Sequence, residues 1–154
     1  MTPFRTILVP LDGSPLSEKA LSPAARIAAT MAHQATGEAI KLVLLRVVSP
    51  VALVAADPML YDEMTRMGSD EAQAYVNTVR ASVDAGGAAV ESSVIVGSPA
   101  DAIVHYAMEN GVDLIIMSSH GRTGSSRWVY GSVAEKVLHH APCATVIIRA
   151  HVAV

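Results

Sequence analysis

Residues 118–136, with the sequence SSHGRTGSSRWVYGSVAEK, bring glycines and hydroxyl side chains together directly after an apolar run. Gly121 and Gly131 have no Cβ, so main-chain N–H groups beside them can approach an anion closely. Gly131-Ser132 stands where a final helix is predicted to begin, and the first N–H groups of a helix favour negative charge. This pattern is suited to binding phosphate through the main chain, with help from the Ser132 hydroxyl.

A second interpretation of the same residues is purely structural. The glycines would then serve tight turns, and Ser132 would cap the helix with Glu135 as its capping-box partner. Short glycine patterns of this kind often occur without a ligand. The spacing alone leaves both interpretations open.

Asp12 is the other residue whose position suggests chemistry, because it directly follows the first apolar run. A carboxylate there can accept hydrogen bonds from a ribose or from an adenine amino group. It can equally form an Asx-turn that leads the strand into the next helix. Ser14 and Pro15 already supply a helix start, so Asp12 is an additional acid at that point.

The familiar catalytic and nucleotide motifs are missing from the sequence. It has no G-x-x-x-x-G-K-[ST] loop, no G-x-G-x-x-G after the first strand, no G-x-S-x-G elbow and no H-E-x-x-H. A single cysteine, Cys143, cannot form an internal disulfide, and no His/Cys cluster suggests zinc. We therefore predict no catalytic residue and no protein-bound metal.

Five apolar runs without polar alternation predict buried strands of a parallel sheet, at residues 6–11, 40–48, 90–96, 112–118 and 144–149. Helical patterns lie between them: one from Ser14-Pro15 to Met31, and others over 69–85, from Ser98-Pro99 to Gly111, and over 131–140. Pro23 should bend the first of these helices or cost it a hydrogen bond. Residues 50–68 are either a mobile flap or short helix near a site, or an irregular segment packed on the sheet.

The alternation of strands and helices predicts an α/β fold, a single domain over residues 1–154. We expect an open five-stranded parallel sheet of order 3-2-1-4-5 with helices on both faces. Ligands of such sheets bind beyond the carboxyl ends of the strands, where the winding direction reverses. In this order strands 1 and 4 flank that point, which would bring Asp12 and the 118–132 stretch together.

Composition limits the partners. The net charge of −3, the pI near 6.0 and a content of one Trp and one Phe argue against nucleic acid. The apolar run near the N-terminus ends at Pro10 and is too short for a secretory or membrane segment. We expect a cytoplasmic protein that does not contact a membrane.

The sequence resembles the universal stress protein family over nearly its whole length. The resemblance rests on ILVPLDGSPLSEKAL at 7–21, LVLLRVV at 42–48, VIVGSPADAIVHYAMENGVDLIIMSSHGR at 94–122 and GSVAEKVLHHAPCATVIIR at 131–149. ATP-binding members carry G-x-x-G, nine residues, then G-S or G-T. Gly121 and Gly131-Ser132 match this motif, whereas Ser118 stands in place of its first glycine. The added Cβ could crowd the ligand, or the hydroxyl could donate a bond.

The resemblance implies an adenine nucleotide alpha-hydrolase-like fold that binds ATP with Mg²⁺. Asp12 would contact the adenosine, the main chain of Val47 would pair with the adenine edge, and Met117 would pack near the base. The implied nucleotide-binding residues are Pro10, Leu11, Asp12, Val47, Met117, Ser118, His120, Gly121, Arg122, Gly131, Ser132 and Val133. Gly97 fits the family's V-G-x-P turn and is expected to be structural.

Three functions fit these features. The first is an ATP-binding regulatory or stress-response protein, which we favour because an anion cradle and an adenine slot are predicted without catalytic machinery. The second is a slow ATPase, and the third is a dimeric adaptor that binds no nucleotide. A homodimer formed through the last strand, residues 144–149, is expected in all three because an apolar edge strand invites pairing.

Overall fold

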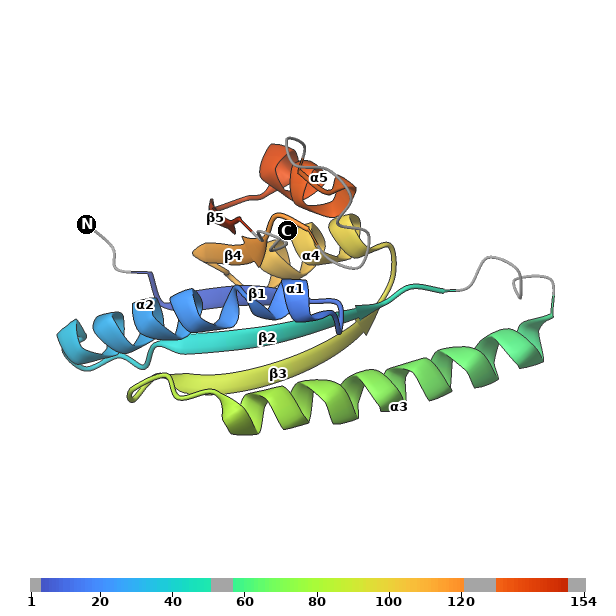
Figure 1. Cartoon of the computed structure of the whole chain (residues 1–154), viewed down its shortest axis with the longest axis horizontal. Coiled ribbons are helices and arrows are strands. Elements are labelled where there is room, and N and C mark those ends of the chain that lie inside the picture. The colour runs from blue at the N-terminus through green and yellow to red at the C-terminus, as the bar shows by residue number, and fades with distance from the viewer. Residues whose placement is uncertain (1–3, 51–56, 121–129, 150–154) are drawn as a thin grey trace, which may run out of the picture.

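The computed structural model describes residues 4–50, 57–120 and 130–149 of the 154-residue chain. Its elements follow one another in the order β1 (Thr6–Leu11), α1 (Pro15–Glu18), α2 (Leu21–Gln34), β2 (Lys41–Val48), α3 (Pro58–Ser82), β3 (Ala89–Val96), α4 (Pro99–Glu109), β4 (Leu114–Ser118), α5 (Ser132–His140) and β5 (Ala144–Ile148). The five strands form one sheet in the order β3-β2-β1-β4-β5 (Figure 1). Every pairing is parallel, so the predicted fold class and strand order are confirmed.

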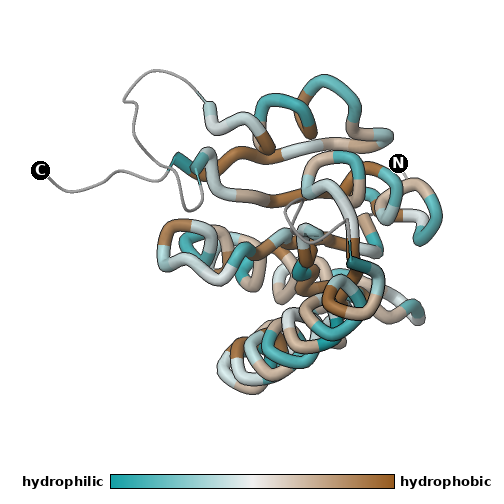
Figure 2. Tube along the Cα trace, turned by 90° about the vertical axis from the view of Figure 1, so that its right-hand side faces the viewer, coloured by the Kyte–Doolittle hydropathy of each residue, from teal (hydrophilic) through white to brown (hydrophobic). Residues whose placement is uncertain are grey.

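Helices cover both faces of the sheet, and each face has its own apolar core. On one face, Ile7, Val9, Leu42 and Leu44 pack against small residues of α2 and against α3. On the other face, strand residues pack against α4 and α5. Figure 2 shows hydrophilic and hydrophobic residues alternating along the turns of the helices. Burial on both faces explains why β1, β2 and β4 read as continuous apolar runs. The prediction of buried strands is wrong for β3 and β5, which lie at the edges of the sheet and contain no buried residue.

The predicted first helix is in fact two helices, and Pro23 does not bend either of them. Glu18 ends α1, and α2 begins at Leu21, so Pro23 falls in the first turn of α2. The N–H groups of a first turn have no partner within the helix, so proline costs nothing there. Pro23 therefore marks a helix start, which the prediction of one bent helix missed.

The third helix starts eleven residues earlier than the predicted 69–85. Asp57 caps it, with its Oδ1 accepting from the N–H groups of Met59 and Leu60 at 3.1 and 3.3 Å, and Pro58 fills the first helical position. In Figure 1, α3 runs beside β3 and continues past the carboxyl ends of the strands. The end of the 50–68 segment is thus a regular helix, while residues 51–56 lie outside the described residues.

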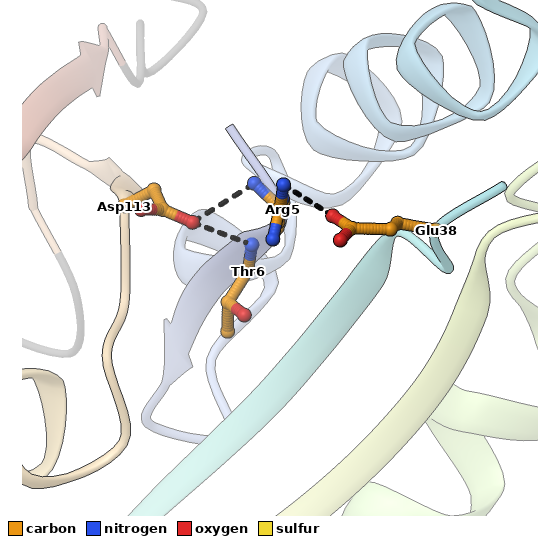
Figure 3. A network of polar contacts seen from close by, with 4 residues as sticks. All are labelled: Arg5, Thr6, Glu38 and Asp113. Carbon is orange, nitrogen blue, oxygen red and sulfur yellow. Dashed lines mark hydrogen bonds and ion pairs between the residues drawn. The ribbon is translucent and has the colours of Figure 1, made fainter. Parts of the chain in front are cut away.

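Asp113 joins the beginnings of β1 and β4 (Figure 3). Its Oδ2 accepts hydrogen bonds from the main-chain N–H groups of Arg5 and Thr6 at 2.8 and 3.0 Å. The Arg5 side chain in turn forms an ion pair with Glu38. These contacts hold the two strands in register at their amino ends, opposite to the end where they separate.

Candidate functional site

The two central strands separate toward their carboxyl ends. β1 pairs with β4 at Ile7–Leu114 and Leu8–Ile115, although both strands continue for three more residues. Pro10 lies in the part of β1 that pairs with β2 but not with β4, and proline has no N–H to donate across the gap. This is where the winding direction reverses, as the strand order requires.

A cavity of about 710 Å³ occupies the gap. It is built from the ends of β1, β2 and β4, the first turns of α4 and α5, and the middle of α3. The lining residues are Pro10, Leu11, Asp12, Gly13, Ser17, Arg46, Val47, Val48, Ser49, Gly68, Glu71, Ala72, Tyr75, Pro99, Ile103, Met117, Ser118, Ser119, His120, Gly131, Ser132, Val133 and Ala134. Its size is within the usual range for small-molecule sites.

The structure brings the predicted site residues together. Every one of them that it describes lines this cavity: Pro10, Leu11, Asp12, Val47, Met117, Ser118, His120, Gly131, Ser132 and Val133. Gly121 and Arg122 lie outside the described residues, as does Gly124. Gly97 does not line the cavity, and its N–H donates to the Val48 carbonyl at 3.0 Å.

Asp12 forms the Asx-turn that the sequence left open as one of its two roles. Its Oδ1 accepts from the Ser14 N–H at 2.9 Å, while its own N–H donates to the Ser17 hydroxyl at 3.3 Å. Ser14 caps α1 as predicted, accepting from the Ser17 N–H at 3.2 Å. Because Asp12 also lines the cavity, the turn fixes the position of a carboxylate at the site.

The α5 start does not contain the capping box. Gly131 is the N-cap residue and no side chain caps the helix, so Ser132 is its first helical residue. The Gly131 N–H donates to the Ser119 carbonyl at 2.8 Å, which ties the loop after β4 to α5. The first-turn N–H groups, lacking a side-chain acceptor, lie at the wall of the cavity with the positive end of the helix dipole.

Space, and not the backbone angles, favours glycine at 131. Its φ of −59° and ψ of 153° suit any residue. A Cβ there would lie 3.1 Å from the Ser119 carbonyl oxygen and 3.7 Å from the His120 Cα, both of them main-chain atoms. A side chain at 131 would therefore press on the main chain that follows β4.

The end of β2 presents a main-chain acceptor to the site. The Val48 carbonyl accepts from Gly97 and so faces β3, which turns the preceding Val47 carbonyl toward β1, just beyond the last β1–β2 pair. The Arg46 side chain reaches around the strand end, and its Nη1 donates to the Val47 oxygen at 2.6 Å. The guanidinium and the carbonyl thus stand side by side at the cavity.

Sequence reasoning missed Arg46 and the lining residues of α3. Arg46 interrupts the apolar run of β2, which is the only hint that its side chain is not in the core. Glu71 and Tyr75 could be found only once α3 was placed over the strand ends. Tyr75 donates its hydroxyl to Glu18 at 2.7 Å, and burial, reinforced by the Glu18 carboxylate, raises the pKa of its phenol.

Comparison with known proteins identifies the chain. A family model described as the universal stress protein family matches residues 3–149. The chain belongs to the universal stress protein family. The universal stress protein MJ0531 of Methanocaldococcus jannaschii is 28% identical over 146 residues, which cover 95% of this chain and 82% of the relative.

Solved structures agree with this assignment. The structure of MJ0577, also a universal stress protein of Methanocaldococcus jannaschii, has a TM-score of 0.83 at 26% identity and covers 99% of this chain and 100% of that one. A universal stress protein solved in complex with cAMP has a TM-score of 0.62 at 25% identity, with coverages of 97% and 100%. The fold assigned above is thus that of known universal stress proteins.

No helix within residues 4–50, 57–120 and 130–149 is long and apolar enough to cross a membrane. No three histidine, cysteine, aspartate or glutamate side chains in the same ranges gather as metal ligands.

Proposed function

We propose that this universal stress protein binds ATP in the cavity between β1 and β4 and acts as a nucleotide-dependent regulatory or stress-response protein. The observation that carries the proposal is the juxtaposition of Asp12 with the uncapped start of α5 across one cavity. An acid that can accept from ribose hydroxyls then lies opposite main-chain donors that favour phosphate. The related universal stress protein that was solved with cAMP supports a purine nucleotide as ligand.

The nucleotide is proposed to lie along the strand ends. The adenine edge contacts the Val47 main chain and packs on Met117, Pro10 and Leu11, and Asp12 contacts the adenosine. The phosphates reach the remaining residues of the proposed site, which are His120, Gly121, Arg122, Gly131, Ser132 and Val133. Mg²⁺, where present, would be held chiefly by the phosphates, since the described residues offer no cluster of metal ligands.

Calorimetry and nucleotide release test this proposal. Titration with ATP is expected to give stoichiometric binding, and GTP to bind more weakly, while AMP and cAMP show which phosphates matter. Denaturing freshly purified protein and separating the supernatant by chromatography identifies any nucleotide it carried.

Asp12→Asn, which keeps the Asx-turn acceptor but loses the charge, should weaken the binding of ATP, whereas Asp101→Asn on the exposed face of α4 should not. Absence of both heat and released nucleotide would refute the proposal.

We further propose that the protein is a homodimer paired through β5. This strand is the last in the sheet order, and Val146 in its middle is 38% exposed. An edge strand with an exposed apolar side chain invites pairing with a second chain. Sedimentation should show a dimer that Val146→Lys dissociates. Val96→Lys, on the opposite edge strand β3 where Val96 is 45% exposed, is the matched control and should leave the dimer intact. A monomeric wild type would contradict this assembly.

A further inference from the structure

Ser118 carries a buried hydroxyl without a partner. The residue is 5% exposed, and its Oγ makes no hydrogen bond to any described residue. The Thr145 Oγ1 in β5 is in the same condition. A buried hydroxyl without a hydrogen bond destabilises the folded protein relative to an apolar group of the same shape.

The two orphaned hydroxyls differ in their position. Ser118 is the last residue of β4, lies beyond the final β1–β4 pair and lines the cavity, whereas Thr145 does not line it. Ile116 belongs to the core beneath α2 and Met117 to the opposite core. Alternation along the strand therefore turns Ser118 toward the side of α1, where Ser17 also lines the cavity.

The hydroxyl groups of Ser17 and Ser119, which line the same cavity, already have hydrogen-bond partners. The Ser17 hydroxyl donates to the Ser14 carbonyl at 2.9 Å and accepts from the Asp12 N–H. The Ser119 Oγ lies 3.1 Å from the His120 Nδ1, within hydrogen-bond distance. Of Ser17, Ser118 and Ser119, which line the cavity, only Ser118 has a buried hydroxyl without a hydrogen-bond partner among the described residues.

We propose that the Ser118 hydroxyl binds a ribose oxygen of the nucleotide, which makes Ser118 a specificity-determining residue of this chain. The inference rests on the proposed ATP site. Ser118 follows Met117, proposed to pack on the base, and precedes the loop that leads to the phosphate-binding start of α5. The ribose lies between base and phosphates, so its hydroxyls are the ligand groups that Ser118 meets. The hydroxyl destabilises the empty protein and is satisfied by the ligand.

The test compares three variants for both stability and affinity. Ser118→Ala should raise the Tm by about 2–4 °C, because it removes the unpartnered hydroxyl, and should lower the affinity for ATP about tenfold. Thr145→Val is the matched control: it removes the other orphaned hydroxyl and should raise the Tm without changing the affinity. Ser118→Gly separates the hydroxyl from the Cβ and should also bind ATP more weakly than the wild type.

Deoxynucleotides identify the contacted oxygen. The loss caused by Ser118→Ala should disappear with either 2′-deoxy-ATP or 3′-deoxy-ATP, whichever lacks the bonded hydroxyl. Unchanged affinity of Ser118→Ala for ATP would overturn the inference while leaving ATP binding intact, and tighter binding by Ser118→Gly would show that the serine obstructs the site. An equal loss with ATP and both deoxynucleotides would overturn the ribose contact. A wild type that gives no heat with ATP would overturn the proposed function as well.

Discussion

Gly131→Val is expected to lower the affinity for ATP by about a hundredfold or more. A Cβ at this position already comes within 3.1 Å of the Ser119 carbonyl oxygen, and valine adds two methyl groups to it. Overpacking of this contact lowers the folding stability and would shift the Ser119 main chain at the cavity wall. The affinity falls because hydrogen bonds to charged phosphate, worth about 1.5–3 kcal/mol each, are lost, and each 1.4 kcal/mol is a factor of about ten in binding. The methyl groups would also cover the first-turn N–H groups of α5 that are proposed to hold the phosphates. Calorimetric titration with ATP measures the loss.

Gly97→Val is the matched control for this experiment. A Cβ at Gly97 would lie 3.3 Å from the Ala102 Cβ, a comparably tight contact, but Gly97 does not line the cavity. This variant should lose stability on urea unfolding and keep its affinity for ATP. If both variants lose affinity equally, or if Gly131→Val still binds as the wild type does, the α5 start is not the phosphate site.

The strands and their order could be predicted because burial on both faces of β1, β2 and β4 leaves a simple pattern, and the edge strands β3 and β5 also keep runs of Val and Ile. Each of the five predicted runs became a strand, and the alternation with helices determined the winding. The helix boundaries were harder to predict because proline is favourable in the first turn of a helix but bends a helix at an interior position. Pro23 and Pro58 stand in the first turns of α2 and α3, where proline is favourable, and nothing local distinguishes that from a proline that bends a helix.

The candidate site was predictable where main-chain geometry builds it. Asp12 follows a strand end and Gly131 stands at a helix start, so topology alone predicts that they meet at one edge of the sheet, whereas Val47 was named through the family resemblance. Topology does not predict that Arg46, Glu71 and Tyr75 line the cavity, because this depends on the directions of their side chains. Arg46 reaches around its own strand, and Tyr75 reaches the site only because α3 packs across the strand ends. Tertiary packing sets the directions of these side chains, and the local sequence around each residue does not predict that packing.

Arg46 changes the electrostatics of the proposed site. The described lining residues include two carboxylates, Asp12 and Glu71, and Arg46 is the permanent cation among them. ATP would otherwise bring several negative charges to a cavity that already holds two. A guanidinium with five donors, fixed by the Val47 carbonyl at 2.6 Å, offsets that repulsion without having to be ordered by the ligand.

Arg46→Met is therefore expected to reduce the affinity for ATP about 10- to 100-fold, since a hydrogen bond to a charged group contributes about 1.5–3 kcal/mol. Methionine keeps an apolar stem and removes only the charge and the donors. The loss should grow from adenosine to AMP to ATP, and added salt should weaken ATP binding less in the variant than in the wild type. Arg46→Lys should retain part of the affinity, and Lys41→Met, which removes an exposed cation at the far end of the same strand, should retain all of it. An equal loss for adenosine and ATP would mean that Arg46 acts through packing of the strand end and not through its charge.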